Sequence, residues 1–150
     1  METHKIVTKK GMIYYEESLN ALVALWNDRF MLQGEYRETM EQVLELMKST
    51  GASSFITDVR TSKVLSRDQQ EYQINEMFPK FIRAGLKRSA YVVPKDVFVQ
   101  SAIGRAEQEL RKYVDVQKFK DLESAKDWVR EESIRETQEA NNKPEGTDTE

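Results

Sequence analysis

The sequence predicts a single α/β domain: a mainly parallel five-stranded sheet with about four helices and an antiparallel hairpin at its amino-terminal edge. A chain of 150 residues is long enough to bury one sizeable core. Short apolar runs typical of strands alternate with longer segments whose apolar residues have helical spacing. Strands that alternate with helices pair in parallel through right-handed crossovers, so we expect most of the sheet to be parallel.

The hairpin and one helix come first. Residues 11–17 mix apolar and polar side chains, as an edge strand does, and residues 18–20 supply a turn. Residues 21–26 are uniformly apolar, which is typical of a strand buried on both faces. A helix is then expected over residues 35–50, because its apolar positions form one stripe and Gly51 is a natural helix terminator.

The middle of the chain contributes two strands with a helical segment between them. Residues 54–59 are the third strand, and Ser66 begins a helix through a capping box with Gln69. Pro79 falls inside the apolar stripe of this helix. We therefore expect a kink, or a break with Pro79 at the first position of a second helix. Residues 88–93 form the fourth strand.

The last part of the domain repeats the pattern. A helix is expected to begin at Pro94 and Asp96 and to bury Ala106 and Leu110, and residues 116–119 form a weak fifth strand. Asp121 then caps the last helix. The apolar positions of that helix are Leu122, Ala125, Trp128 and Val129.

The predicted domain spans residues 1–134, and a disordered acidic tail spans residues 135–150. Apolar periodicity stops after Glu132, and the sequence beyond it is polar and rich in Glu. Acidic side chains outnumber basic ones in this tail. The body of the chain is therefore close to neutral, although the whole chain has a net charge of −3.

Composition excludes several classes of function. The chain has no Cys, which excludes disulfides, thiolate catalysis and Cys-ligated metals, and the single His4 argues against a zinc site. A near-neutral body lacks the basic face of nucleic-acid-binding proteins. The longest apolar run is too short to span a membrane, and the amino terminus has no secretory signal. We expect a soluble cytoplasmic protein without a cofactor or metal.

Polar side chains gather after the predicted strands, where the carboxyl ends of an open parallel sheet bind ligands. The candidate residues for binding a ligand or partner are Asp28, Asp58, Arg60, Thr61, Ser62 and Lys95. The guanidinium of Arg60 offers a fork for a carboxylate or phosphate group. A purely structural explanation is also open: Asp58 can accept N–H bonds within its own turn, and Ser66 and Asp96 can simply cap helices.

Three stretches of the chain, taken in order, resemble the STAS-like proteins, which are named for sulfate transporters and anti-sigma factor antagonists. They are "TDVR" at the end of the third strand, "AGLKRSAYVVP" around the fourth and "FKDLESAKDWV" near the end, and they cover roughly residues 11–132. The chain is more closely similar to the small stand-alone bacterial STAS/SEC14-like proteins of that superfamily. This resemblance implies a β-α superhelix with regulatory or ligand-binding duties rather than catalysis.

The resemblance also implies a candidate phosphosite. Phosphorylatable members carry a Ser or Thr in an Asp-Ser-[Ser/Thr]-Gly turn at the helix after the third strand, where partner kinases modify it and so break a protein complex. The matching region here is "KVLSRDQ", in which Ser66 is the hydroxyl at the helix start. The Asp before it and the Gly after it are absent.

We therefore expect a non-enzymatic regulatory or protein-interaction domain that works through the carboxyl ends of its parallel strands. Its partner would be an unidentified protein or small ligand, with a homodimer as a further option. One alternative is a carrier of a small apolar or anionic ligand; a less favoured one is an enzyme that uses Asp28, Asp58 and Asp96. The side chains that would line a carrier's apolar pocket are Tyr36, Met40, Met47, Phe78 and Phe81, although such stripes are more often core.

Overall fold

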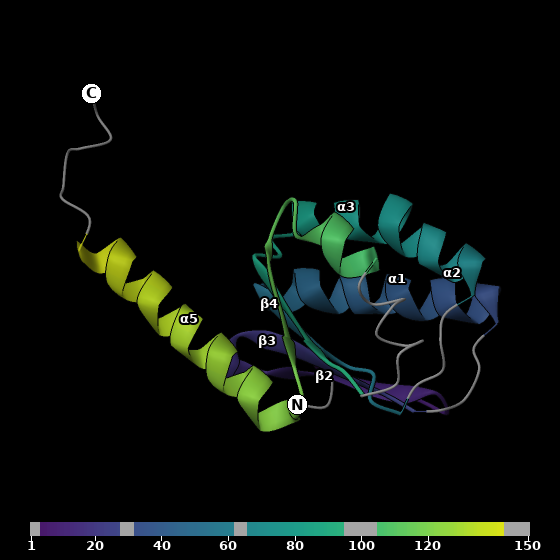
Figure 1. The fold of residues 1–150 in the computed structure, drawn as a ribbon, viewed down its shortest axis with the longest axis horizontal. Helices are drawn as coiled ribbons and strands as arrows, with labels where there is room; N and C mark the ends of the chain where they lie inside the picture. Colours follow the sequence, from purple (N-terminus) through teal and green to yellow (C-terminus); the bar gives the residue numbers. More distant parts are fainter. Residues whose placement is uncertain (1–3, 28–31, 62–65, 95–104, 143–150) are drawn as a thin grey trace.

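Six strands form one sheet, and they lie side by side in the order in which they occur along the chain (Figure 1). The structure is a computed structural model and describes residues 4–27, 32–61, 66–94 and 105–142. The strands are β1 Lys5–Thr8, β2 Gly11–Glu16, β3 Ala21–Trp26, β4 Ser54–Asp58, β5 Arg88–Val92 and β6 Asp115–Phe119. The first three pair antiparallel, and β3 to β6 pair in parallel. The predicted single α/β domain with a mixed sheet is confirmed.

Strand β2 is not the edge strand that its mixed composition predicts. It pairs with β3 on one side and with β1 on the other, so β1 forms the edge of the sheet. Strand β1 has only four residues and is flanked by polar side chains, which leaves almost no alternating pattern to detect. The sheet therefore has six strands rather than the five predicted, and the additional strand, β1, is antiparallel to β2.

Two residues of the hairpin region are fixed by their backbone surroundings. Gly11 lies so close to the neighbouring strand that a Cβ atom there would come 2.6 Å from the Leu25 carbonyl oxygen. Asn20 adopts a left-handed conformation, with φ of 50°, and ends the turn between β2 and β3. Its side chain accepts a hydrogen bond from the Tyr15 hydroxyl at 2.7 Å and donates one to the Gly51 carbonyl at 3.3 Å.

Helices cover both faces of the sheet. Those on one face come from the middle of the chain, and α5 covers the other (Figure 1). The helices and helical turns are η2 Glu17–Leu19, α1 Gln33–Thr50, α2 Arg67–Tyr72, η3 Gln73–Met77, α3 Phe78–Arg83 and α5 Leu122–Asn142. Residues 105–110 are also helical, and Ala106 and Leu110 are buried there as predicted.

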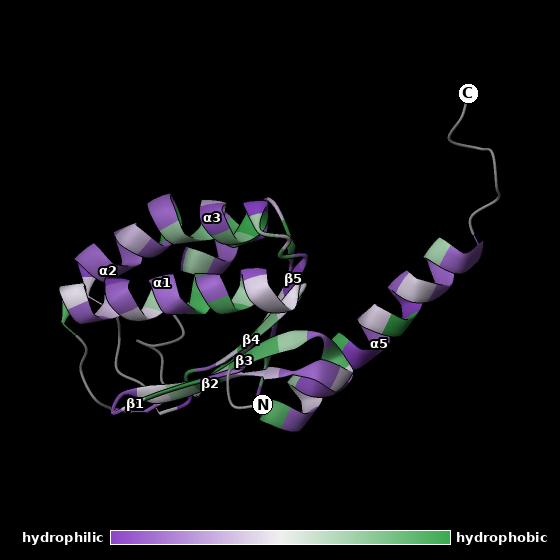
Figure 2. Ribbon diagram, turned by 180° about the vertical axis from the view of Figure 1, so that it is seen from behind, coloured by the Kyte–Doolittle hydropathy of each residue, from purple (hydrophilic) through white to green (hydrophobic). Residues whose placement is uncertain are grey.

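Each face of the sheet has its own core. Figure 2 shows α1, α2 and α3 lying together on one side of the sheet. The larger core lies beneath α1, α2 and α3 and includes Leu22, Val43, Met47 and Phe81. The smaller core lies beneath α5. Its buried members are Leu19, Ala21, Val23, Ile56, Ala90, Val92, Ala125 and Val129. Strand β3 supplies alternate residues to both cores, which explains why its sequence is uniformly apolar.

The irregularity predicted at Pro79 takes the form of a π turn. Helix α2 leads into the π turn η3, and α3 follows at Phe78 with Pro79 in its first turn. Proline has no N–H group to donate, and the wider π turn is a common way for a helix to absorb such a local mismatch. The chain therefore continues through Pro79 with a change of helical geometry.

Helix α5 is longer than its apolar pattern predicts. It runs to Asn142, so residues 135–142 are helical, whereas a disordered tail is predicted to begin at residue 135. The apolar periodicity stops because only Ala125 and Val129 of this helix are buried, and no residue of the helix after Val129 belongs to either core. Glu, Arg and Gln are good helix formers, so the helix continues without an apolar stripe. Residues 143–150 of the predicted tail lie outside the described residues.

Candidate functional site

A fork of hydrogen bonds joins Asp58 and Arg60 at the carboxyl end of β4. Arg60 donates from Nε to Asp58 Oδ1 at 3.1 Å and from Nη2 to Asp58 Oδ2 at 2.7 Å. The backbone N–H of Arg60 also donates to Asp58 Oδ1, at 3.1 Å, which closes a tight turn directly after the strand. The two-residue spacing that suggests a site in the sequence thus produces an internal ion pair of fork geometry.

Arg60 is the accessible member of this pair. The side chain of Asp58 is 12% exposed and that of Arg60 is 41% exposed. The hydrogen bond that Arg60 donates to Asp58 raises the pKa of the guanidinium, so the group stays charged. Its Nη1 has no partner within the part of the chain that the structure describes, which leaves donor capacity available to another molecule.

Asp121 adds a second acid to this edge of the sheet. It accepts a hydrogen bond from the Ser124 N–H at 2.7 Å and so caps α5, as predicted. The bonds from Ser124 lower the pKa of the Asp121 carboxyl, and the positive charge of Arg60 lowers it further. The sequence predicts Asp121 only as a helix cap. Because β6 runs parallel to β4, however, the residues after β6 reach the same edge as Arg60.

Thr61 ties the turn after β4 to the neighbouring strand. Its hydroxyl donates to the Trp26 carbonyl at 3.2 Å, which links this turn to the end of β3. The Val59 N–H donates to the Val92 carbonyl at 2.9 Å, so β4 and β5 remain paired beyond Asp58. Asp58, Arg60 and Thr61 are therefore held on an ordered edge built from adjacent parallel strands.

Other predicted site residues lie outside the described part of the chain. These are Asp28, Ser62 and Lys95. Asn27, which precedes Asp28, is described and turns toward the hairpin. Its side chain donates to the Lys9 carbonyl at 2.7 Å.

The candidate phosphosite Ser66 forms the predicted capping box. Its hydroxyl accepts the Gln69 N–H at 3.1 Å, and the Gln69 side chain accepts the Ser66 N–H at 3.2 Å. This reciprocal pair satisfies two backbone donors at the start of α2. The cap accounts for Ser66 structurally, and its phosphorylation stays a prediction.

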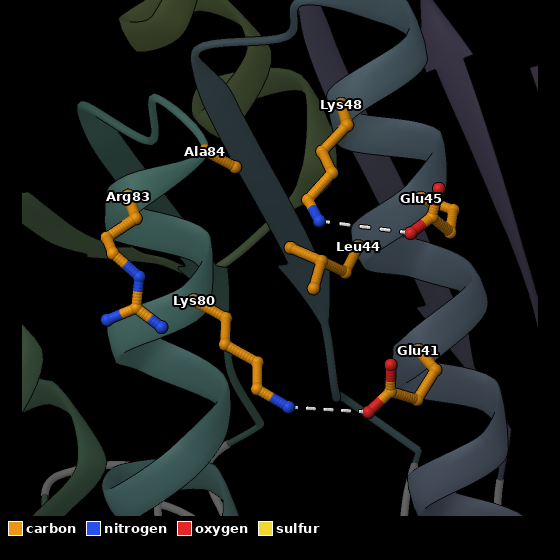
Figure 3. Close-up of a pocket in the computed structure, with 7 residues that line it drawn as sticks. All are labelled: Glu41, Leu44, Glu45, Lys48, Lys80, Arg83 and Ala84. Atoms are coloured by element: carbon orange, nitrogen blue, oxygen red, sulfur yellow. Dashed lines mark hydrogen bonds and ion pairs between the residues drawn. The ribbon is translucent and has the colours of Figure 1, made fainter.

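An open groove of about 360 Å³ lies between α1 and α3 (Figure 3). Charged side chains form most of its walls, with Leu44 and Ala84 between them. Lys80 reaches across it to Glu41 at 3.5 Å, and Lys48 pairs with Glu45 along α1 at 3.9 Å (Figure 3). The basic groups lie near the last turns of both helices, where they complement the helix dipoles.

The side chains proposed for an apolar carrier pocket are packed in the larger core. All of them are at most 6% exposed: Tyr36, Met40, Met47, Phe78 and Phe81. Phe81 stacks on Phe55 with ring centroids 5.7 Å apart, so the space beside it is filled by protein. Tyr91 lies in the same core, and burial raises the pKa of its hydroxyl to about 12, as expected in an interior without water.

Two further features bear on the type of site. Among residues 4–27, 32–61, 66–94 and 105–142, no group of three or more acidic or His side chains is arranged to hold a metal ion. Over the same residues, no helix has the length and apolar character needed to cross a bilayer.

Comparison of the chain with protein-family models, with curated proteins and with solved structures found no match.

Proposed function

We propose that this chain is a non-enzymatic regulatory or protein-interaction domain of STAS-like type, and that it binds a partner protein through the carboxyl ends of its parallel strands. The observation that carries the proposal is the Asp58–Arg60 fork. Both carboxylate oxygens of Asp58 are engaged by Arg60, which suits a positioned binding group better than a catalytic base.

The partner group that fits this edge is an acidic side chain. Arg60 is held in one orientation by Asp58 and keeps Nη1 for an incoming carboxylate. A guanidinium fixed in advance loses less side-chain entropy on binding than a mobile one, and planar bidentate recognition is the particular strength of arginine. Asp121 beside it would disfavour a partner that carries excess negative charge, which adds selectivity.

The two alternatives receive less support from the described residues. A carrier needs an enclosed apolar pocket, whereas the aromatic and Met side chains suggested for it are buried in the core. The groove between α1 and α3 is open and largely charged. An acid-based enzyme would rely on Asp58, which is already paired with Arg60.

Affinity capture from the native cell with matched variants tests this proposal. Arg60→Lys keeps the positive charge beside Asp58 but loses the fork of hydrogen bonds. It should therefore lower the affinity for the captured partner at least tenfold. Arg67→Lys is the control, since Arg67 is 87% exposed and lies on the first turn of α2. A partner that binds Arg60→Lys and Arg60→Ala as tightly as the unchanged chain would contradict the proposal.

A further inference from the structure

A cluster of basic side chains lies at the amino ends of β4 and β5, at the other end of these strands from the Asp58–Arg60 pair. Arg88 is the first residue of β5, and its side chain is only 7% exposed. Its Nη1 donates to the Ser54 hydroxyl at 3.0 Å, and its Nη2 donates to Glu136 Oε1 at 2.9 Å. Lys87 donates from Nζ to Glu136 Oε2 at 2.8 Å. Each oxygen of this one carboxylate therefore faces its own cation.

The fold builds this cluster from residues far apart in the sequence. The parallel register of β4 and β5 sets Ser54 directly beside Arg88, on the face of the sheet that α5 covers. A buried guanidinium needs an anion close to it, since an unpaired charge away from water is strongly unfavourable. Lys87, Arg88 and Ser54 together supply donors of the kind that bind carboxylate and phosphate oxygens.

One donor of the cluster is left without a partner. Arg88 Nε is buried and makes no hydrogen bond within the described residues. The carboxylate of Glu136 accepts one bond at each oxygen, from Lys87 and from Arg88 Nη2, and neither oxygen accepts from Arg88 Nε. A tetrahedral oxyanion has more acceptor oxygens and can satisfy this remaining donor as well.

Glu136 reaches the cluster from a loosely held part of α5. No residue after Val129 in this helix is buried, and residues 137–142 are all exposed. Figure 1 shows this part of α5 extending away from the sheet. A helical segment with few buried contacts opens locally at low free-energy cost, so the Glu136 contact is the weak point of the cluster.

We propose that Ser54, Lys87 and Arg88 form a binding site for a phosphate-type oxyanion, and that Glu136 occupies this site in the resting chain. The external anion enters when the distal part of α5 moves away and takes Glu136 with it. Because Glu136 is part of the same chain, it competes at a local concentration on the order of millimolar. The apparent affinity for the external anion equals the intrinsic affinity multiplied by the fraction of molecules in which Glu136 has left the site. The site is thereby coupled to the position of α5.

Titration with inorganic phosphate at constant ionic strength, followed by amide NMR shifts of residues 86–90, tests the competition. Glu136→Gln removes the competing charge and should bind phosphate at least fivefold more tightly than the unchanged chain. Glu139→Gln is the matched control, because Glu139 is exposed on the same helix and should leave the affinity unchanged. Adding Lys87→Gln to Glu136→Gln should abolish the gain. A gain below fivefold, or a gain that survives Lys87→Gln, overturns the proposal.

Hydrogen exchange of the unchanged chain gives a readout that needs no variant. Saturating phosphate should speed exchange of the amides of residues 133–138 severalfold relative to sodium chloride of equal ionic strength, because Glu136 is displaced. Exchange in β4 and β5 should not accelerate. If residues 133–138 exchange at the same rate in both salts, Glu136 is not the competitor and the proposal fails.

Discussion

Asp58 receives both Nε and Nη2 of Arg60, two residues further along the chain, at 3.1 and 2.7 Å. Hydrogen bonds to charged groups contribute roughly 1.5–3 kcal/mol when buried, and the exposure of Arg60 reduces that value. We expect Asp58→Ala to lower the free energy of unfolding by about 1–2 kcal/mol in urea denaturation. Asp68→Ala, at an exposed position of α2, should cost less than about 1 kcal/mol. Equal losses from the two variants would show that the fork adds no stability.

The two glycines Gly11 and Gly34 should respond to alanine in opposite directions. A Cβ at Gly11 would come 2.6 Å from the Leu25 carbonyl oxygen and 2.9 Å from the Trp26 ring, so Gly11→Ala should destabilise by about 1–3 kcal/mol. Gly34 lies in α1 with nothing within 4 Å of the added atom, so Gly34→Ala should stabilise by about 0.5–1 kcal/mol. Thermal and urea unfolding measure both. A stable Gly11→Ala would mean that β2 and β3 can move apart without loss.

The Glu136 contact predicts a dependence of stability on pH. Hydrogen bonds from Lys87 and Arg88 lower the pKa of the Glu136 carboxyl below its usual 4.5 in the folded chain. A lowered folded-state pKa gives stability that is present above the unfolded-state pKa and is lost as pH falls through the folded-state value. The unchanged chain should therefore exceed Glu136→Gln in stability at pH 7, and the two curves should converge as pH falls from 4.5 through the folded-state pKa. Since Glu136 is 40% exposed, the difference at pH 7 should be about 1 kcal/mol or less. A constant gap from pH 7 to pH 3 would rule out this ionic contribution.

The capping box at the start of α2 gives a fourth prediction. Ser66→Ala should cost about 1 kcal/mol, because the Gln69 N–H loses its acceptor. Ser66→Asn should retain most of the stability, since Asn is an equally good N-cap residue. Urea unfolding of the two variants separates the loss of the cap from a general intolerance of substitution. A full loss in Ser66→Asn would mean that the hydroxyl has a function other than capping.

Local patterns predicted most of the fold because most elements carry their own signals. The apolar run of β3, the glycine after α1 and the capping box of α2 each depend on a few adjacent residues. Strand β1 was missed because four residues cannot establish a period. The distal part of α5 was missed because it is helical without being packed, so no apolar stripe marks it.

The candidate site was only partly predictable for a related reason. The sequence places Asp58 and Arg60 in one turn, but it does not reveal that each satisfies the other, which depends on side-chain rotamers. Asp121 joins the same edge only through the parallel pairing of β6. The contact between Arg88 and Glu136 joins residues 48 positions apart and requires both the strand register and the path of α5.

The sequential strand order has a consequence for how the chain folds as it is synthesised. Every strand pairs with the one made just before it, so the sheet can grow at one edge without waiting for distant segments. The face beneath α5 is different, because α5 is made after all six strands. Ala21, Val23 and Ile56 remain uncovered until then, so a nascent chain halted just before residue 122 would expose one apolar face of the complete sheet. Such a chain is a natural substrate for chaperones, and α5 is the element that ends this exposure.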